Sequence, residues 1–258
     1  MNLILTRRSQ NNFIWKAKRK MKWNKLYTYP KSVREIINDK RHYAIDDSKL
    51  PSVTTILSAT QSKEKQESLA KWKAKVGETE AERVKNVAAT RGTAMHKYLE
   101  YYVEGQGLLD LTDVGQEAQR MAQTIINQGM GDVDEIWGSE VVLSYKDKYA
   151  GATDLCGVYQ GRESIMDFKQ SNKPKRDEWI EDYYLQSAAY ALAHNDKYGT
   201  DIEQGVILMC TPDCFFQRFI VNGKRFREYT EQWKRKVEQY YEQTQKRLDS
   251  GDNNSKIG

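Results

Sequence analysis

The sequence predicts an α/β fold, a short mixed β-sheet flanked by helices. Apolar patterns follow one another along the chain in the order helices, three strands, helix, two strands, helix, and strands interrupted by a helix favour a sheet covered by helices. The chain has 258 residues, 39% of them hydrophobic and 11% aromatic, which is enough for a packed core and too many for a disordered chain. Its three cysteines are too few to crosslink a secreted scaffold. No apolar run approaches the roughly 18 residues of a membrane span. We therefore expect a soluble, intracellular protein.

Residues 1–46 are predicted to be a basic N-terminal arm. Residues 1–41 hold twelve Lys and Arg against two acids, a net charge of +10, whereas the rest of the chain sums to −5. Aromatic residues such as Trp15 and Trp23 lie among these cations, and this mixture suits nucleic acid because cations attract phosphate and rings stack on bases. A flexible, solvated extension explains the same composition, and a basic segment poor in acids also fits an organellar transit peptide.

Residues 47–249 are predicted to form the folded domain, and its first half is helical. Residues 51–57 are predicted to be an extended segment, and their Ser and Thr hydroxyl groups can cap a following helix. Helical patterns follow over residues 63–85, about 90–103 and 115–128. Because these helices precede the strands, they can arch over a site that the strands carry.

The second half of the domain alternates strands with helices. Runs of β-branched and aromatic residues, separated by turn residues, predict strands, and longer apolar stripes predict helices. The elements expected are strands over 139–145, 151–159 and 164–169, a helix over 176–198, strands over 205–211 and 214–221, and a helix over 225–248. Residues 250–258 form a polar tail.

Two aspartates and a lysine on neighbouring strands indicate chemistry. A two-residue turn at 160–161 would place Asp154 directly opposite Asp167, with their Cβ atoms about 5 Å apart. Two carboxylates so close repel unless a cation lies between them or one is protonated, and hard oxygen ligands suit Mg²⁺ or Mn²⁺. A slip of one residue would send Asp154 to the other face, so the prediction depends on this turn.

Lys169 lies two residues beyond Asp167 and therefore shares its face, whereas Met166 and Phe168 point to the opposite layer. An ammonium group there could orient the attacking water and offset charge on a phosphate in the transition state. A divalent cation would activate that water. Asp and Lys on strands also form ordinary surface ion pairs, so spacing alone leaves both interpretations open.

The pattern of Asp154 with Asp167-x-Lys169 resembles the PD-(D/E)XK nuclease superfamily in its RecB-like branch. Further segments that carry the resemblance are Ser52–Leu57, Gly92–Glu100, Tyr159–Gly161, Lys173–Lys175 and Leu185–Tyr190. Together they are similar to the family of mitochondrial genome maintenance exonuclease 1, with its phage and bacterial relatives, over about residues 50–245. The resemblance implies a restriction-endonuclease-like core with an additional N-terminal helical region.

The resemblance also implies roles for individual residues. It assigns metal binding to His96, Asp154, Asp167 and the backbone carbonyl of Phe168, and catalysis to Asp154, Asp167, Lys169, Gln186 and Tyr190. Considered without it, His96 would be a core histidine, and Gln186 with Tyr190 would be routine helix packing one turn apart. Gln170 departs from the family, in which a threonine often follows the lysine. Glu140 is either near the metal or an edge-strand surface charge.

The function implied is hydrolysis of phosphodiester bonds by a Mg²⁺- or Mn²⁺-dependent DNA exonuclease that prefers single strands or flaps with a free end. The alternatives are a non-catalytic single-stranded DNA-binding protein and a duplex endonuclease of recombination or packaging. We expect DNA as the partner, no membrane, a monomer, and the cytoplasm of a bacterial or phage-infected host rather than the mitochondrion. An iron–sulfur cluster is not expected, because only Cys156, Cys210 and Cys214 are present. Candidates for contacts to the DNA backbone are Lys71, Lys73, Arg91, Lys173 and Lys175.

Overall fold

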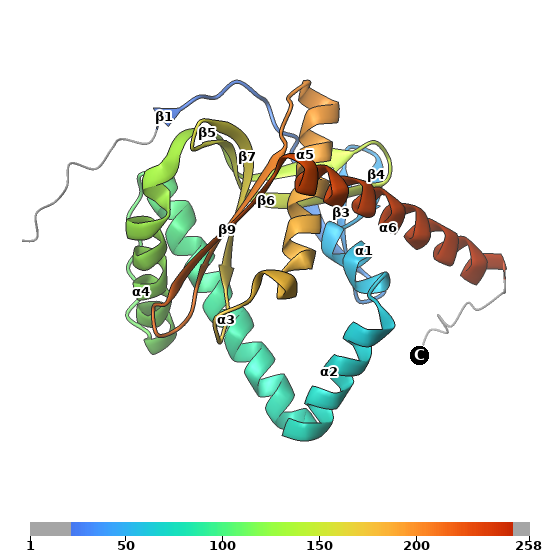
Figure 1. The fold of residues 1–258 in the computed structure, drawn as a ribbon, viewed down its shortest axis with the longest axis horizontal. Helices are drawn as coiled ribbons and strands as arrows, with labels where there is room; N and C mark the ends of the chain where they lie inside the picture. The colour runs from blue at the N-terminus through green and yellow to red at the C-terminus, as the bar shows by residue number, and fades with distance from the viewer. Residues whose placement is uncertain (1–21, 250–258) are drawn as a thin grey trace, which may run out of the picture.

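A six-stranded mixed sheet forms the centre of the computed structural model, which describes residues 22–249 (Figure 1). Its strands lie in the order β1-β5-β6-β7-β8-β9. Their bounds are β1 Lys22–Trp23, β5 Val133–Tyr145, β6 Tyr149–Tyr159, β7 Arg162–Gln170, β8 Gln204–Cys210 and β9 Phe216–Asn222. β5, β6 and β7 form an antiparallel meander, β7 pairs with β8 in parallel, and β9 is antiparallel to β8. From α1 (Val53–Ala59) onward the strands and helices follow the predicted order, whereas β1 was not predicted.

Helices cover both faces of this sheet, so the predicted α/β architecture is confirmed (Figure 1). The helices are α1 Val53–Ala59, α2 Lys63–Val76, α3 Glu78–Val103, α4 Asp113–Gln128, α5 Glu181–Tyr198 and α6 Gly223–Asp249, with 3₁₀ turns η1 Met130–Asp132 and η2 Asp177–Trp179. Within residues 22–249, none of the helices combines the length and the apolar character needed to cross a membrane.

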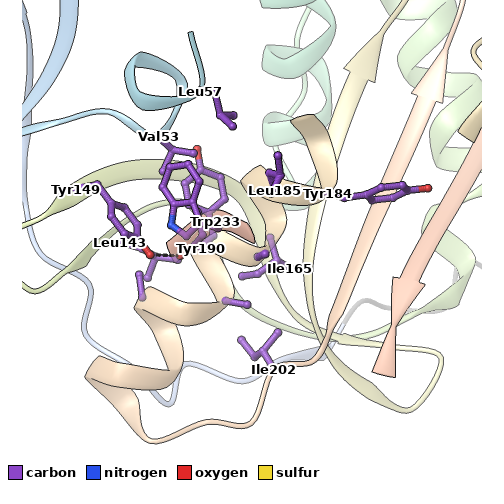
Figure 2. Packing of buried hydrophobic residues seen from close by; sticks show 14 of the residues in the cluster. Val53, Leu57, Leu143, Tyr149, Ile165, Tyr184, Leu185, Tyr190, Ile202 and Trp233 are labelled. Carbon is purple, nitrogen blue, oxygen red and sulfur yellow. Dashed lines mark hydrogen bonds between the residues drawn. The ribbon is translucent and has the colours of Figure 1, made fainter. Parts of the chain in front are cut away.

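The two faces of β7 serve two separate hydrophobic clusters. Met166 and Phe168 pack with α3 and α4 on one face, whereas Ile165 packs with α5 on the other. Figure 2 shows the second cluster, where Val53 of α1 and Trp233 of α6 meet the side chains of α5. Since side chains alternate along a strand, Asp167 and Lys169 lie on the α5 face, opposite to Met166 and Phe168 as predicted.

Three helix boundaries differ from the sequence prediction. Residues 53–57 are helical rather than extended, because the Ser52 hydroxyl caps α1 by accepting a hydrogen bond from the Thr55 amide at 3.0 Å. The break in the charged helical region lies at Gly77, whose φ of 85° few other residues adopt. As a result α3 is continuous from Glu78 to Val103. The helix expected from residue 176 begins at Glu181, after the turn η2.

The sequence prediction missed a second, smaller antiparallel sheet. It consists of β2 Val33–Ile37, β3 Lys40–Ile45 and β4 Ser48–Pro51, which lie largely within the segment predicted as a basic arm. Its Tyr43, Ile45 and Leu50 are buried against Ala150 of β6. Charged and apolar residues do not alternate regularly in β2 and β3, so the period-two signal of a strand is weak here. The remainder of the predicted arm, residues 1–21, and the tail, residues 250–258, lie outside the described residues.

The segment between β1 and the small sheet packs on α5. Tyr27 and Tyr29 lie against His194, with ring centroids 4.9 and 5.9 Å from the imidazole, and the Tyr29 hydroxyl is 3.2 Å from His194 Nε2. The Tyr29 hydroxyl also lies 3.0 Å from Cys156 Sγ. Residues 22–46 therefore belong to the packed structure, and the chain from β1 onward is anchored by aromatic contacts.

Candidate active site

The hairpin of β6 and β7 has the predicted register. Tyr159 pairs with Arg162 and Leu155 pairs with Met166 across a turn at residues 160–161, whose φ angles of 50° and 74° are typical of a two-residue hairpin turn. The paired region ends at Leu155 and Met166. The two strands separate at the next position, which is occupied by Asp154 and Asp167.

Asp154 stabilises this fork in the sheet. Its Oδ2 accepts a hydrogen bond of 2.5 Å from the backbone amide of Phe168, so a side chain takes the place of the ladder partner that the separating strand no longer provides. Phe168 thus contributes its amide to the site in this structure. The role predicted for its carbonyl oxygen stays a prediction.

A pocket of about 470 Å³ lies at the fork. The side chains predicted from the sequence meet there, and they come from the main sheet, α3 and α5. Those lining it are His96, Asp154, Asp167, Lys169, Gln186 and Tyr190, together with Glu140 and, from the small sheet, Arg34, Arg41 and Tyr43. Sequence reasoning did not identify the three small-sheet residues, because nothing in the local pattern relates residues 34–43 to the hairpin.

Three side chains in this pocket form a possible cation site. His96 Nδ1 lies 3.1 Å from Asp154 Oδ1, and ligand atoms of His96, Glu140 and Asp154 all lie within 4.8 Å of one another. Glu140 sits in β5 between the pairs Ser139–Leu155 and Val141–Thr153, opposite Asp154, with a φ of 50°. Two carboxylates and an imidazole are groups that can together hold a divalent cation.

Asp167 forms an ion pair with Lys169 instead of joining this trio. The Lys169 ammonium also lies 5.1 Å from the centroid of the Tyr183 ring, a cation–π contact that the sequence did not reveal. Burial alone would lower the pKa of Lys169, but the charges of Asp167 and Asp154 outweigh it and raise that pKa. The lysine is therefore cationic at neutral pH.

The two aspartates have opposite pKa shifts. Burial raises the pKa of Asp167 to about 6, since the nearby Asp154 charge adds to burial and Lys169 compensates only in part. Burial would also raise the pKa of Asp154, but the charge and hydrogen bond of His96, with those of Lys169 and the Phe168 amide, lower it. Different pKa values for neighbouring carboxylates are common in catalytic sites.

His96 and Glu140 complete the electrostatics of the pocket. Burial would lower the pKa of His96, but Asp154 overrides this effect and raises it to about 8. The pKa of Glu140 is raised as well, by partial removal from water and by the Asp154 charge. The closeness of the two acids Glu140 and Asp154 thus carries an electrostatic cost that a bound cation would relieve.

Gln186 and Tyr190 lie on the side of α5 that faces the pocket. Gln186 Nε2 donates a hydrogen bond of 3.0 Å to the Tyr190 hydroxyl, and burial raises the pKa of that hydroxyl. The Tyr190 ring rests on Gly151, where an added Cβ would come within 2.7 Å of it. A glycine at this position therefore lets the tyrosine reach the site.

Arg91 does not have the exposure that a DNA contact requires. It is buried and donates hydrogen bonds to Gln170, Glu117 and Asn172. The expectation that it contacts the DNA backbone is therefore wrong, because these three acceptors already hold its guanidinium. Gln170, the position that departs from the family pattern, instead helps to join α3 to the end of β7.

Comparison with known proteins shows that the chain resembles exonucleases. It is 24% identical to mitochondrial genome maintenance exonuclease 1 of Homo sapiens over 204 residues, which cover 75% of this chain and 58% of the relative. The protein of the same name from Mus musculus is 30% identical over 175 residues, 64% of this chain and 50% of the relative. The chain thus spans about half the length of the curated relatives it matches.

No family model matches the chain. A crystal structure of a candidate exonuclease from Eubacterium rectale is similar with a TM-score of 0.45 and 16% sequence identity, over 62% of this chain and 68% of that chain.

Proposed function

We propose that this protein is a DNA exonuclease that requires Mg²⁺ or Mn²⁺ and acts on single strands or flaps with a free end. The observation that carries the proposal is the convergence of Asp154, Asp167 and Lys169 with His96 and Glu140 in one pocket. The exonucleases that the chain resembles favour this chemistry over other uses of such a pocket.

In this proposal the acidic side of the pocket holds the cation and the lysine side faces the phosphate. His96, Asp154, Asp167 and the Phe168 carbonyl are the proposed ligands, joined by Glu140. When bound, a divalent cation supplies polarisation of a phosphoryl oxygen and a lowered pKa for the attacking water. Hydrolysis then adds the water oxygen to phosphorus and breaks one P–O bond of the backbone.

Lys169 and α5 provide the remaining contributions. Lys169 lies between Asp167 and the Tyr183 ring, so its N–H groups have a fixed direction in which to orient water and offset charge on the phosphate. Gln186 donates a hydrogen bond to the Tyr190 hydroxyl. This hydroxyl is a second donor group, on the α5 side of the pocket. Both contributions require a preorganised site.

The proposed preference for single strands has separate support. α2 has no buried residue and projects with the first part of α3 away from the sheet (Figure 1). Trp72 is exposed there beside Lys71 and Lys73. Aromatic rings among cations suit an unpaired strand, whose bases are free to stack.

End-labelled linear single strands, flapped duplexes and circular single strands, each incubated with Mg²⁺, test the proposal. We expect degradation of linear and flapped DNA, an intact circle, and no cleavage in EDTA. Asp154→Asn and Lys169→Ala should each lower the rate at least about 100-fold, whereas the exposed Asp201→Asn serves as the matched control. Cleavage of the circle would indicate an endonuclease. Binding without cleavage would indicate a non-catalytic DNA-binding protein.

Thermal unfolding provides a readout that does not depend on activity. A cation at a hundredfold excess over its dissociation constant should stabilise the folded protein by about 2.7 kcal/mol. We expect Mn²⁺ to raise the melting temperature of the wild type and of Asp201→Asn but not of Asp154→Asn. An equal rise in all three proteins would contradict a cation site at Asp154.

A further inference from the structure

We propose that Arg34 and Arg41 form an arginine clamp that holds the two phosphates on either side of the scissile one. This inference rests on the proposed function and adds to it the path that the substrate strand follows. The two arginines belong to the small sheet, outside the segments that carry the resemblance to nucleases.

The register of the small sheet places both arginines on one face. Arg34 pairs with Tyr43, and Ile36 pairs with Arg41. Directly opposed residues share a face, as do residues two apart on a strand, so these four side chains lie on the same side. On this face Tyr43 is buried against β6, and Arg34 opposite it and Arg41 two residues away line the pocket together with it.

Neither guanidinium is already engaged by the protein. Among residues 22–249, Arg34 and Arg41 form no hydrogen bond or ion pair with another side chain, although the neighbouring Glu35 is paired with Lys49. Both arginines are exposed. A guanidinium group directed into a pocket with its donors free is suited to phosphate, which it binds with two parallel hydrogen bonds.

The hollows next to the pocket define a path through it. Arg34 lines both the pocket and a neighbouring groove with Thr93 and Lys97. Arg41 lines both the pocket and a second groove, with Lys40 and Arg247 at its sides. One arginine thus stands at each junction, so that a strand crossing the pocket passes from one groove to the other.

The charges along this path explain why a clamp is needed. The floor of the pocket carries Glu140, Asp154 and Asp167, which repel a polyanion when they are ionised. Arginines at both junctions offset this repulsion and hold the backbone on each side of the acids. The two flanking phosphates, held by the arginines, then place the scissile phosphate over the proposed cation site. The clamp residues are positioning residues and do not take part in bond breaking.

The test compares Arg34→Gln, Arg41→Gln and the double variant with Arg162→Gln, an exposed arginine at the far end of the β6–β7 hairpin. Anisotropy of a fluorescent oligothymidine, measured in EDTA from about 50 to 300 mM NaCl, reports binding without cleavage. The log–log salt slope should fall by roughly 0.7 for each single variant and roughly 1.4 for the double variant. With Mg²⁺, KM should rise about tenfold for each lost charged contact while kcat changes less.

The control should match the wild type in both measurements, and unchanged melting temperatures would show that the variants fold. A double variant with the salt slope and KM of the control would overturn the clamp. A wild type that binds the oligonucleotide without cleaving it would refute the proposed exonuclease activity, while the slopes would still decide the clamp. A wild type that does not bind single-stranded DNA would overturn both.

Discussion

His194 should make the protein sensitive to mild acid. It is fully buried, and its ring nitrogens lie 3.2 Å from the Tyr29 hydroxyl and 2.8 Å from the Thr200 hydroxyl. Burial lowers the pKa of His194 from 6.5 to about 4. The unfolded chain therefore binds this proton near pH 6.5, and the folded protein binds it only near pH 4. His194 thus stabilises the folded state least at low pH.

The size of the effect follows from these two pKa values. Below about pH 4 the shift lowers the free energy of unfolding by about 3 kcal/mol. At pH 5 the loss is about 2 kcal/mol, and at pH 7 it is close to zero. The stability is present above pH 6.5 and is lost as the pH falls through the range between the two values. A neutral residue such as glutamine at this position removes the dependence.

Urea unfolding of the wild type and of His194→Gln at pH 5, 6 and 7 measures this prediction. The variant should be less stable than the wild type at pH 7, and the difference should shrink by about 2 kcal/mol at pH 5. Other titrating groups, including those of the pocket, act equally in both proteins and cancel in the difference. A difference that is the same at every pH would refute the assigned role of His194.

Two further predictions concern the packing that supports the site. Arg91→Met should lower the free energy of unfolding by about 2 kcal/mol, because three acceptors lose a buried charged donor. Arg91→Lys should recover less than half of this loss in urea unfolding, since an ammonium lacks the planar fork, and full recovery would contradict the argument. Trp233→Ala should cost about 3 to 5 kcal/mol, because Trp233 is fully buried against Tyr149. Trp233→Phe should cost clearly less, and equal losses for the two Trp233 variants would argue against a cavity effect.

Sequence patterns were sufficient to predict the features that depend on residues close together in the sequence. The turn at residues 160–161 and the alternation of side chains define the register of β6 with β7, so the sequence alone was enough to place Asp154 and Asp167 together. Gln186 and Tyr190 could be placed on one helix face for the same reason, because a helical turn brings them together. Glu140 was ambiguous, since its position depends on a backbone conformation with φ of 50°.

The sequence prediction was wrong for charged segments that pack against distant parts of the chain. Arg91 was expected at the surface with other cations, but tertiary packing surrounds it with Gln170, Glu117 and Asn172. Residues 33–51 were expected to belong mostly to a basic arm, yet they form strands whose few apolar side chains find partners on β6. Such partners are distant in the sequence, so no local window contains the signal.

The sequence by itself determined the order of strands and helices from α1 onward, the register of the β6–β7 hairpin and the presence of both aspartates at one site, because turn geometry and side-chain periodicity act over a few residues. Only the tertiary structure decided that His96 of α3, Glu140 of β5 and Asp154 of β6 meet within 4.8 Å. It also decided that Arg34 and Arg41 line the same pocket. These contacts depend on how the small sheet and α3 pack on the main sheet, and that packing is set by long-range burial of apolar surface rather than by local preference.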